Sequence, residues 1–126
     1  AGRKIPLYGN GKNSRDWLYV EDCVRGLFAT LARGKSGNVY CLGAECEVAN
    51  KTLTEWIGKY LGAQVAVVAD RPGHDLRYAT NPFKAMSELE WAPTVKLNSL
   101  TVQAVCDWYK DNEPWWKAAV DRGARW

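Results

Sequence analysis

Short apolar runs alternate with segments of helical periodicity along this chain of 126 residues. The runs at residues 5–8, 17–20, 39–43 and 65–68 have the length and composition of strands. Strands that alternate with helices are typical of α/β domains, in which helices cover a sheet. Three to four short strands are few for a complete doubly wound sheet. The sequence therefore predicts a small layered α/β domain that looks like part of something larger.

Two helices are predicted in the first half of the chain. The first follows from apolar residues that recur three and four positions apart, namely Val20, Val24, Leu27, Phe28 and Leu31. Gly34 is its expected end. The second is predicted to begin with a capping box formed by Thr52 and Glu55 and to end at Gly62.

Two more helices are predicted in the second half, which gives about four in all. Asn81 and Pro82 suit the cap and first position of a short helix with Phe83, Met86 and Leu89 on its buried side. Residues 97–110 predict a longer helix with one apolar stripe, formed by Leu100, Ala104, Val105 and Trp108. Among the seven tryptophans, some are expected either to pack in the core or to face a further domain.

Length and composition favour one ordinary globular domain over residues 1–126. The apolar share is 47% and the charged share 25%, as in soluble proteins. No apolar run is long enough to cross a bilayer, and the first residues do not form a secretory signal. We therefore expect no membrane partner and a cytoplasmic location.

Neither a metal site nor a nucleic-acid partner is expected. The four cysteines, Cys23, Cys41, Cys46 and Cys106, include no Cys-x-x-Cys pair and are expected to be reduced thiols. The only histidine, His74, is distant from them in sequence. The net charge of +3 is mild, and the lysines and arginines are scattered along the chain.

Basic side chains in loops suggest a pocket for a small anion. Arg15 precedes one apolar run, whereas Arg71, His74 and Arg77 surround the turn at Pro72 and Gly73. Guanidinium groups match phosphate oxygens, and a diphosphate needs two or more cations that converge from different segments. For either Arg15 or Arg71 alone, a surface salt bridge is the simpler interpretation.

Residues 8–12 match the spacing of one catalytic motif but are not expected to form it. Tyr8 and Lys12 have the Tyr-x-x-x-Lys spacing of short-chain dehydrogenases, in which a helix places both side chains on one face. Gly9 and Gly11 between them disfavour a helix. We therefore expect no catalytic residue and no cofactor-binding residue in this chain.

Three segments carry a resemblance to a known family: IPLYGNGKNSRDWLYVED at residues 5–22, ADRPGHDLRYA at 69–79 and ELEWAP at 88–93. Together they resemble the carboxyl-terminal part of dTDP-glucose 4,6-dehydratases, which are extended short-chain dehydrogenases/reductases. The resemblance implies the substrate domain of such an enzyme, without the Rossmann domain that binds NAD and supplies the catalytic residues.

The resemblance also implies residue roles. The segment Pro6, Leu7 and Tyr8 would lie against the nucleotide base, partly through its main chain, and Arg15 would reach the diphosphate. The remaining pocket residues would be Asn50, Asp70, Arg71, Pro72, Gly73 and His74.

Two hypotheses follow for the function, and the sequence leaves open whether the chain acts as an enzyme. In the first, the chain is a truncated dehydratase that binds a dTDP-sugar, alone or paired with a separate Rossmann domain, and does not catalyse by itself. In the alternative, it is a non-enzymatic module that self-associates into a homo-oligomer through an exposed apolar surface.

Overall fold

The computed structural model describes residues 3–122 and confirms the small α/β domain. Its elements are, in order, β1 (Ile5–Tyr8), β2 (Ser14–Asp16), α1 (Val20–Arg33), β3 (Glu47–Ala49), α2 (Asn50–Leu61), β4 (Val65–Val68), β5 (Arg77–Tyr78), α3 (Phe83–Leu89), α4 (Ser99–Asp111) and α5 (Glu113–Asp121). The fifth helix begins beside Pro114, beyond the four that the sequence predicted.

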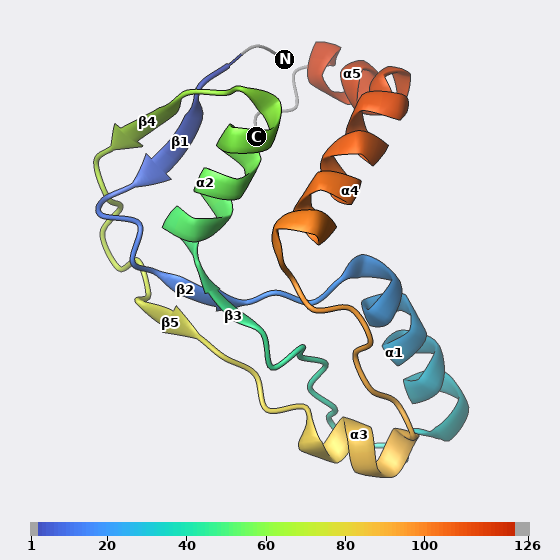
Figure 1. Cartoon of the computed structure of the whole chain (residues 1–126). Helices are drawn as coiled ribbons and strands as arrows, with labels where there is room; N and C mark the ends of the chain where they lie inside the picture. The colour runs from blue at the N-terminus through green and yellow to red at the C-terminus, as the bar shows by residue number, and fades with distance from the viewer. Residues whose placement is uncertain (1–2, 123–126) are drawn as a thin grey trace.

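The strands form two small sheets. β1 pairs in parallel with β4, with Ile5 opposite Val65. In the other sheet β2 lies between β3 and β5, antiparallel to the first and parallel to the second. Figure 1 shows the β1–β4 pair at one end of the molecule and the three-stranded sheet near its middle.

The helices are divided between two regions (Figure 1). α2 lies between the β1–β4 pair and α4 and contacts both. α1 packs on α3 at the opposite end, where the fully buried cluster consists of Ala29, Ala85, Leu89 and Trp91. Gly26 of α1 is also buried, and a Cβ there would lie 2.7 Å from the Leu42 side chain. The absence of a side chain at Gly26 thus allows α1 to pack closely against Leu42 in the segment that follows the helix.

Two predicted strands are wrong. Residues 17–19 lead into α1, and the strand of this segment lies earlier, at β2. Residues 39–43 form no strand in the described structure. Their side chains are used instead: Leu42 packs on the buried cluster, and the Tyr40 hydroxyl donates to Glu88 Oε2 at 3.0 Å. An apolar run forms a strand only beside another strand, and the described residues provide none here.

Helix ends agree with the sequence better at the carboxyl side than at the amino side. Gly34 and Gly62 follow α1 and α2 as predicted. The Thr52–Glu55 capping box is wrong, because α2 begins at Asn50 without a side-chain cap. The N–H groups of Asn50 and Lys51 donate instead to main-chain carbonyls of the turn before β2. That tertiary contact satisfies N–H groups that a capping box would serve.

The buried faces of α3 and α4 were predicted only in part. Phe83 is 72% exposed, although Leu89 is fully buried and the Asn81 side chain accepts from the Phe83 N–H at 2.9 Å as a cap would. In α4 the buried residue is Val102, whereas Leu100 is 72% exposed. Helical spacing identified both helices but did not show which side meets a neighbour.

Within residues 3–122, no helix combines the length and apolar content needed to cross a bilayer. In the same range, no three His, Cys, Asp or Glu side chains gather closely enough to hold a metal ion.

Candidate anion-binding site

The end of β1 and the loop after β4 lie side by side because the two strands are paired in register. Tyr8 stands opposite Val68, and the Gly9 N–H donates to the Val68 carbonyl at 3.0 Å. Two residues beyond Val68 the loop of residues 70–75 begins. The pairing therefore brings two segments that are sixty residues apart in sequence to one edge of the molecule.

His74 is the buried member of this loop. Its side chain is only 7% exposed, and Nδ1 lies 2.7 Å from Asp70 Oδ1. The Tyr8 ring meets the His74 ring edge-on, with centroids 6.2 Å apart. Asp70 Oδ1 also accepts from the Arg71 N–H at 2.9 Å. The hydrogen bond from His74, followed by the bond from the Arg71 main chain, holds the pKa of Asp70 below its usual range even though desolvation opposes the shift.

Gly9 allows the loop to come this close. Its φ is +55°, and a Cβ at this position would lie 3.0 Å from Asp70 Oδ2 and 3.2 Å from Asp70 Cβ. A side chain would therefore be strained by the backbone and would also press on Asp70. Gly9 thus fixes how closely the end of β1 approaches the loop.

Arg15 lies on β2, beside the same loop. Its guanidinium donates to the Ser14 carbonyl at 2.7 Å and to the Asp75 carbonyl at 2.9 Å. It also sits over the Tyr78 ring, with Cζ 4.6 Å from the centroid. Asn13 Nδ2, just before β2, donates to the same Asp75 carbonyl at 3.0 Å, so two side chains fix the loop to β2 and to the residue that precedes it.

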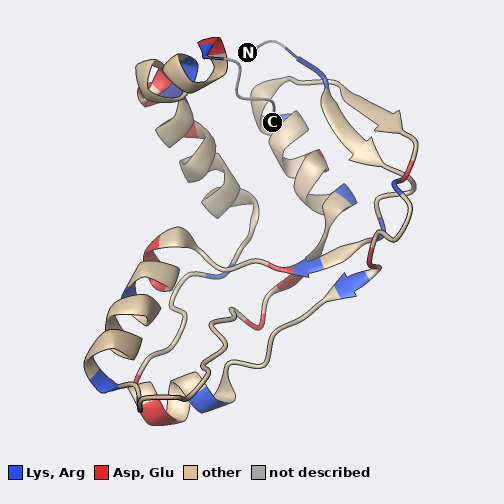
Figure 2. Cartoon of the chain, turned by 180° about the vertical axis from the view of Figure 1, so that it is seen from behind, with Lys and Arg blue, Asp and Glu red and all other residues tan. Residues whose placement is uncertain are grey.

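Arg15 and Arg77 lie on adjacent strands but differ in whether a carboxylate pairs with them. Figure 2 shows basic stretches on the adjacent strands β2 and β5. Arg77 on β5 makes a bidentate ion pair with Glu47, with both N–O distances 2.6 Å. Within residues 3–122, neither Arg15 nor Arg71 has a carboxylate within 4 Å. Two of the three arginines here thus keep a positive charge available to a ligand.

Tyr78 lies beside Arg15 and is bonded through its hydroxyl to Asp75 of the same loop. The hydrogen bond between its hydroxyl and the Asp75 carboxylate raises the pKa of Tyr78, and the charges of Arg15 and Arg71 oppose that rise. Sequence analysis did not select Tyr78 or Asp75, although both lie in the segment that carries the family resemblance.

The other predicted residues surround this edge in different ways. Pro6 is exposed on β1, whereas Leu7 is 8% exposed and points toward Gly11, where a Cβ would lie 2.8 Å from Leu7 Cδ1. Leu7 can therefore reach a ligand only through its main chain. Asn50 is the first residue of α2, and Pro72 and Gly73 are exposed at the turn of the loop.

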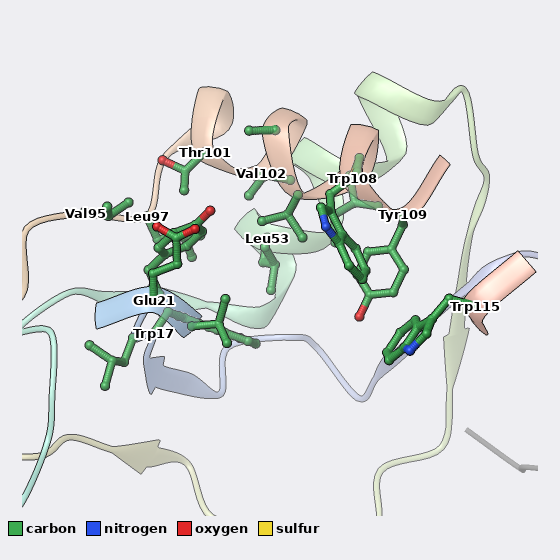
Figure 3. Close-up of a pocket in the computed structure, with 17 residues that line it drawn as sticks. Trp17, Glu21, Leu53, Val95, Leu97, Thr101, Val102, Trp108, Tyr109 and Trp115 are labelled. Carbon is green, nitrogen blue, oxygen red and sulfur yellow. The ribbon is translucent and has the colours of Figure 1, made fainter. Parts of the chain in front are cut away.

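The predicted residues line neither of two hollows that the structure contains. An apolar groove of about 690 Å³ runs between the start of α1, α2 and α4, with Trp17, Leu53, Trp108 and Trp115 on its walls (Figure 3). A polar cleft of about 430 Å³ includes Glu47 and Arg77. The candidate anion-binding edge, which is formed by the end of β1, Arg15 on β2 and the 70–75 loop, thus lies outside both hollows.

The rejected Tyr-x-x-x-Lys motif lies at the same edge. Residues 9–12 form a turn, in which the Gly11 N–H donates to the Tyr8 carbonyl at 3.1 Å and the Lys12 N–H to Asn10 Oδ1 at 2.9 Å. Tyr8 and Lys12 therefore do not share a helical face, as the sequence predicted.

Comparison with known families identifies the family of the chain. The family model described as GDP-mannose 4,6 dehydratase matches residues 1–104. The chain belongs to this family. Among curated members, a dTDP-glucose 4,6-dehydratase of Streptomyces niveus is 41% identical, over 92% of this chain and 35% of its own length.

Solved structures of dTDP-glucose 4,6-dehydratases are similar to this chain. The dTDP-glucose 4,6-dehydratase of Bacillus anthracis, in complex with NAD, aligns with a TM-score of 0.82 at 39% identity, over 93% of this chain and 38% of that one. DesIV, a dTDP-glucose 4,6-dehydratase of Streptomyces venezuelae with NAD and TYD bound, aligns with a TM-score of 0.84 at 38% identity, over 93% and 37% of the two chains. The chain therefore spans little more than a third of the length of these relatives.

Proposed function

We propose that this chain is the sugar-nucleotide-binding part of a dTDP-glucose 4,6-dehydratase and that it holds the diphosphate through Arg15 and Arg71. The observation that carries the proposal is the charge balance at the edge of β1, β2 and the 70–75 loop. Arg77 is neutralised by Glu47, but Arg15 and Arg71 are not neutralised by a described carboxylate. Diphosphate oxygens are suitable partners for two such guanidiniums.

The neighbouring residues would complete the ligand contacts. Tyr8 is 46% exposed and is held by the edge of the His74 ring, so its own surface remains accessible to a flat group such as a nucleotide base. Main-chain atoms of Pro6 and Leu7 and the side chain of Asn50 would contact the nucleotide from β1 and α2. NAD and the catalytic groups would belong to the part of the relatives that this chain does not span, so the chain alone would not catalyse.

Calorimetric titration of the purified chain with dTDP tests the proposal, with NAD as the control ligand. Saturable binding of dTDP without binding of NAD is expected. Binding of neither ligand by a folded chain would contradict autonomous nucleotide binding. Binding of NAD would contradict the proposal that NAD binds to the part of the relatives that this chain does not span.

Arg71→Ala tests the role of one cation. We expect dTDP affinity to fall by about 1.5 to 3 kcal/mol, the scale of a hydrogen bond to a charged group. Lys59→Ala is the matched control, because Lys59 is an exposed cation on α2 and its loss changes the net charge equally. Equal losses of affinity for Arg71→Ala and Lys59→Ala would show that only the net charge matters, and would overturn the assignment of Arg71 to the diphosphate.

A second function is favoured by the apolar face of α1. Its five predicted stripe residues are between 44% and 83% exposed: Val20, Val24, Leu27, Phe28 and Leu31. Trp108 and Trp115 at the apolar groove are 48% and 66% exposed, whereas Trp91 is buried. Apolar surface of this extent is typical of a contact with another domain.

We propose that the occupant of the α1 stripe is a dinucleotide-binding domain equivalent to the part of the relatives that lies outside this chain. The 62–65% of each relative that the chain does not span leaves room for a domain of that kind. Sedimentation of the chain mixed with the separately expressed remainder of DesIV tests this, and a one-to-one complex is expected. Phe28→Asp should abolish the complex. A dimer of the chain alone that Phe28→Asp disrupts would favour the self-associating module instead.

A further inference from the structure

We propose that Tyr78 is a positioning residue of the anion-binding edge, because its ring holds the Arg15 guanidinium in the orientation in which it meets a diphosphate. This inference rests on the proposed function and adds a residue to it. It concerns a side chain that would act through Arg15.

The sheet register places the two residues together. β2 and β5 run in parallel, with Arg15 directly opposite Tyr78. The guanidinium carbon lies 4.6 Å from the centre of the ring, within the range of a cation–π contact. Because both residues are on paired strands, the backbone register brings the ring and the guanidinium together, and Asp75 of the 70–75 loop then holds both side chains.

Arg15 is held without using up its donors. A guanidinium has five N–H groups. The structure assigns one bond to the Ser14 carbonyl and one to the Asp75 carbonyl. The ring supplies a third restraint that consumes no N–H group, so three donors remain for phosphate oxygens. An ion pair such as that between Arg77 and Glu47 would fix the side chain but would remove its charge.

Tyr78 is itself fixed, and it is not a core residue. Its side-chain hydroxyl donates to the Asp75 carboxylate, and the residue is 55% exposed. Asp75 therefore serves both partners, through its carboxylate to Tyr78 and through its carbonyl to Arg15. A half-exposed aromatic ring with little core contact can be replaced with small effect on folding, which makes the role testable.

The experiment compares wild type, Tyr78→Leu and Tyr78→Phe in NMR titrations with dTDP and with thymidine, which lacks phosphate. Tyr78→Leu should weaken dTDP binding by about two- to fivefold, the scale of an exposed cation–π contact. Thymidine affinity should not change. Tyr78→Phe keeps the ring and is the matched control, with dTDP affinity within about twofold of wild type if the ring carries the effect. An equal loss for thymidine would show a merely structural role and overturn the proposal.

A double-mutant cycle with Arg15→Ala separates positioning from direct contact. If Tyr78 acts through Arg15, Tyr78→Leu should have no further effect on dTDP binding in the Arg15→Ala background. An additive effect would overturn the proposal.

A second measurement does not depend on nucleotide binding. The Arg15 Nε–H resonance should be shifted by the ring in wild type and in Tyr78→Phe, and should move to the position of a free arginine in Tyr78→Leu. Failure of wild type to bind dTDP would contradict the proposed function, and the resonance would still decide whether Tyr78 orients Arg15. An unchanged resonance in Tyr78→Leu would overturn the inference.

Discussion

Helices α1 and α2 have similar apolar spacing in sequence, but different interactions hold them in the fold. α2 has β1 and β4 on one side and α4 on the other, and its apolar residues Trp56 and Ile57 are half-buried. α1 contacts α3, yet its apolar stripe is exposed and its buried residues are Asp22, Gly26 and Ala29. Half-buried apolar side chains, together with the buried residues Thr54 and Gly58, hold α2, whereas small residues and a buried carboxylate hold α1.

Asp22 is the polar anchor of α1. Its Oδ2 accepts from the N–H groups of Thr94 and Val95 at 2.9 Å each, and its Oδ1 accepts from the Thr94 hydroxyl at 2.8 Å and from Arg25. Its carbonyl accepts from Trp91 Nε1 at 3.0 Å. Burial by itself raises the pKa of Asp22, but the bonds from Val95, Arg25 and Thr94 outweigh it and lower the pKa to about 2.

The largest expected effect is therefore on this anchor. Asp22→Ala leaves the Arg25 charge and two main-chain donors without their partner, and we expect a loss of about 3 to 5 kcal/mol in the free energy of unfolding. Urea denaturation measures it. Asp22→Asn preserves the shape and should cost less, so it serves where the alanine variant does not fold. A loss below about 1 kcal/mol for alanine would contradict the anchoring role.

The same carboxylate predicts a pH dependence. The pKa of Asp22 is lowered from 3.8 to about 2 in the folded chain, so between these values the unfolded state binds more protons. Asp22 should contribute about 2 kcal/mol above about pH 5 and lose it progressively as the pH falls toward 2. Denaturation of wild type and Asp22→Asn at pH 5 and pH 2.5 isolates this contribution from the other carboxylates. Parallel losses in both proteins would contradict the assignment.

A smaller effect is expected from the apolar face of α2. Ile57 is half-buried at the groove between α2 and α4, so Ile57→Ala should cost about 1 to 2 kcal/mol, less than the substitution of a fully buried isoleucine. The free energy of unfolding in urea measures it. A cost within error of zero would show that α2, like α1, is held mainly by other contacts.

The smallest effect is expected on the exposed stripe of α1. Leu31 is 83% exposed, so Leu31→Ala should change the free energy of unfolding by no more than about 0.5 kcal/mol. Ile57→Ala is its counterpart on α2. A cost for Leu31→Ala equal to that for Ile57→Ala would show that the stripe is covered in the isolated chain, for example by a second copy, and dilution would then reduce the cost.

The candidate anion-binding edge was predicted from the sequence only in part. Basic residues around a turn predicted an anion pocket, and the structure brings Arg15 and the 70–75 loop together. Spacing alone could not reveal Tyr78, because its relation to Arg15 depends on the parallel register of β2 and β5. It also could not show that Arg77 is neutralised by Glu47, thirty residues away. The ligand roles of the ten predicted residues remain predictions.

The sequence by itself determined the strands β1 and β4, the approximate extents of four helices and the glycines that follow α1 and α2. The helices depend on periodicity, and Gly62 ends α2 because glycine readily adopts the left-handed conformation found there. Tertiary structure alone decided the start of α2 at Asn50, the absence of a strand at residues 39–43 and the exposure of the α1 stripe. Each depends on which distant segment supplies a hydrogen-bond partner or an apolar surface, and helical or strand spacing contains no information about that partner.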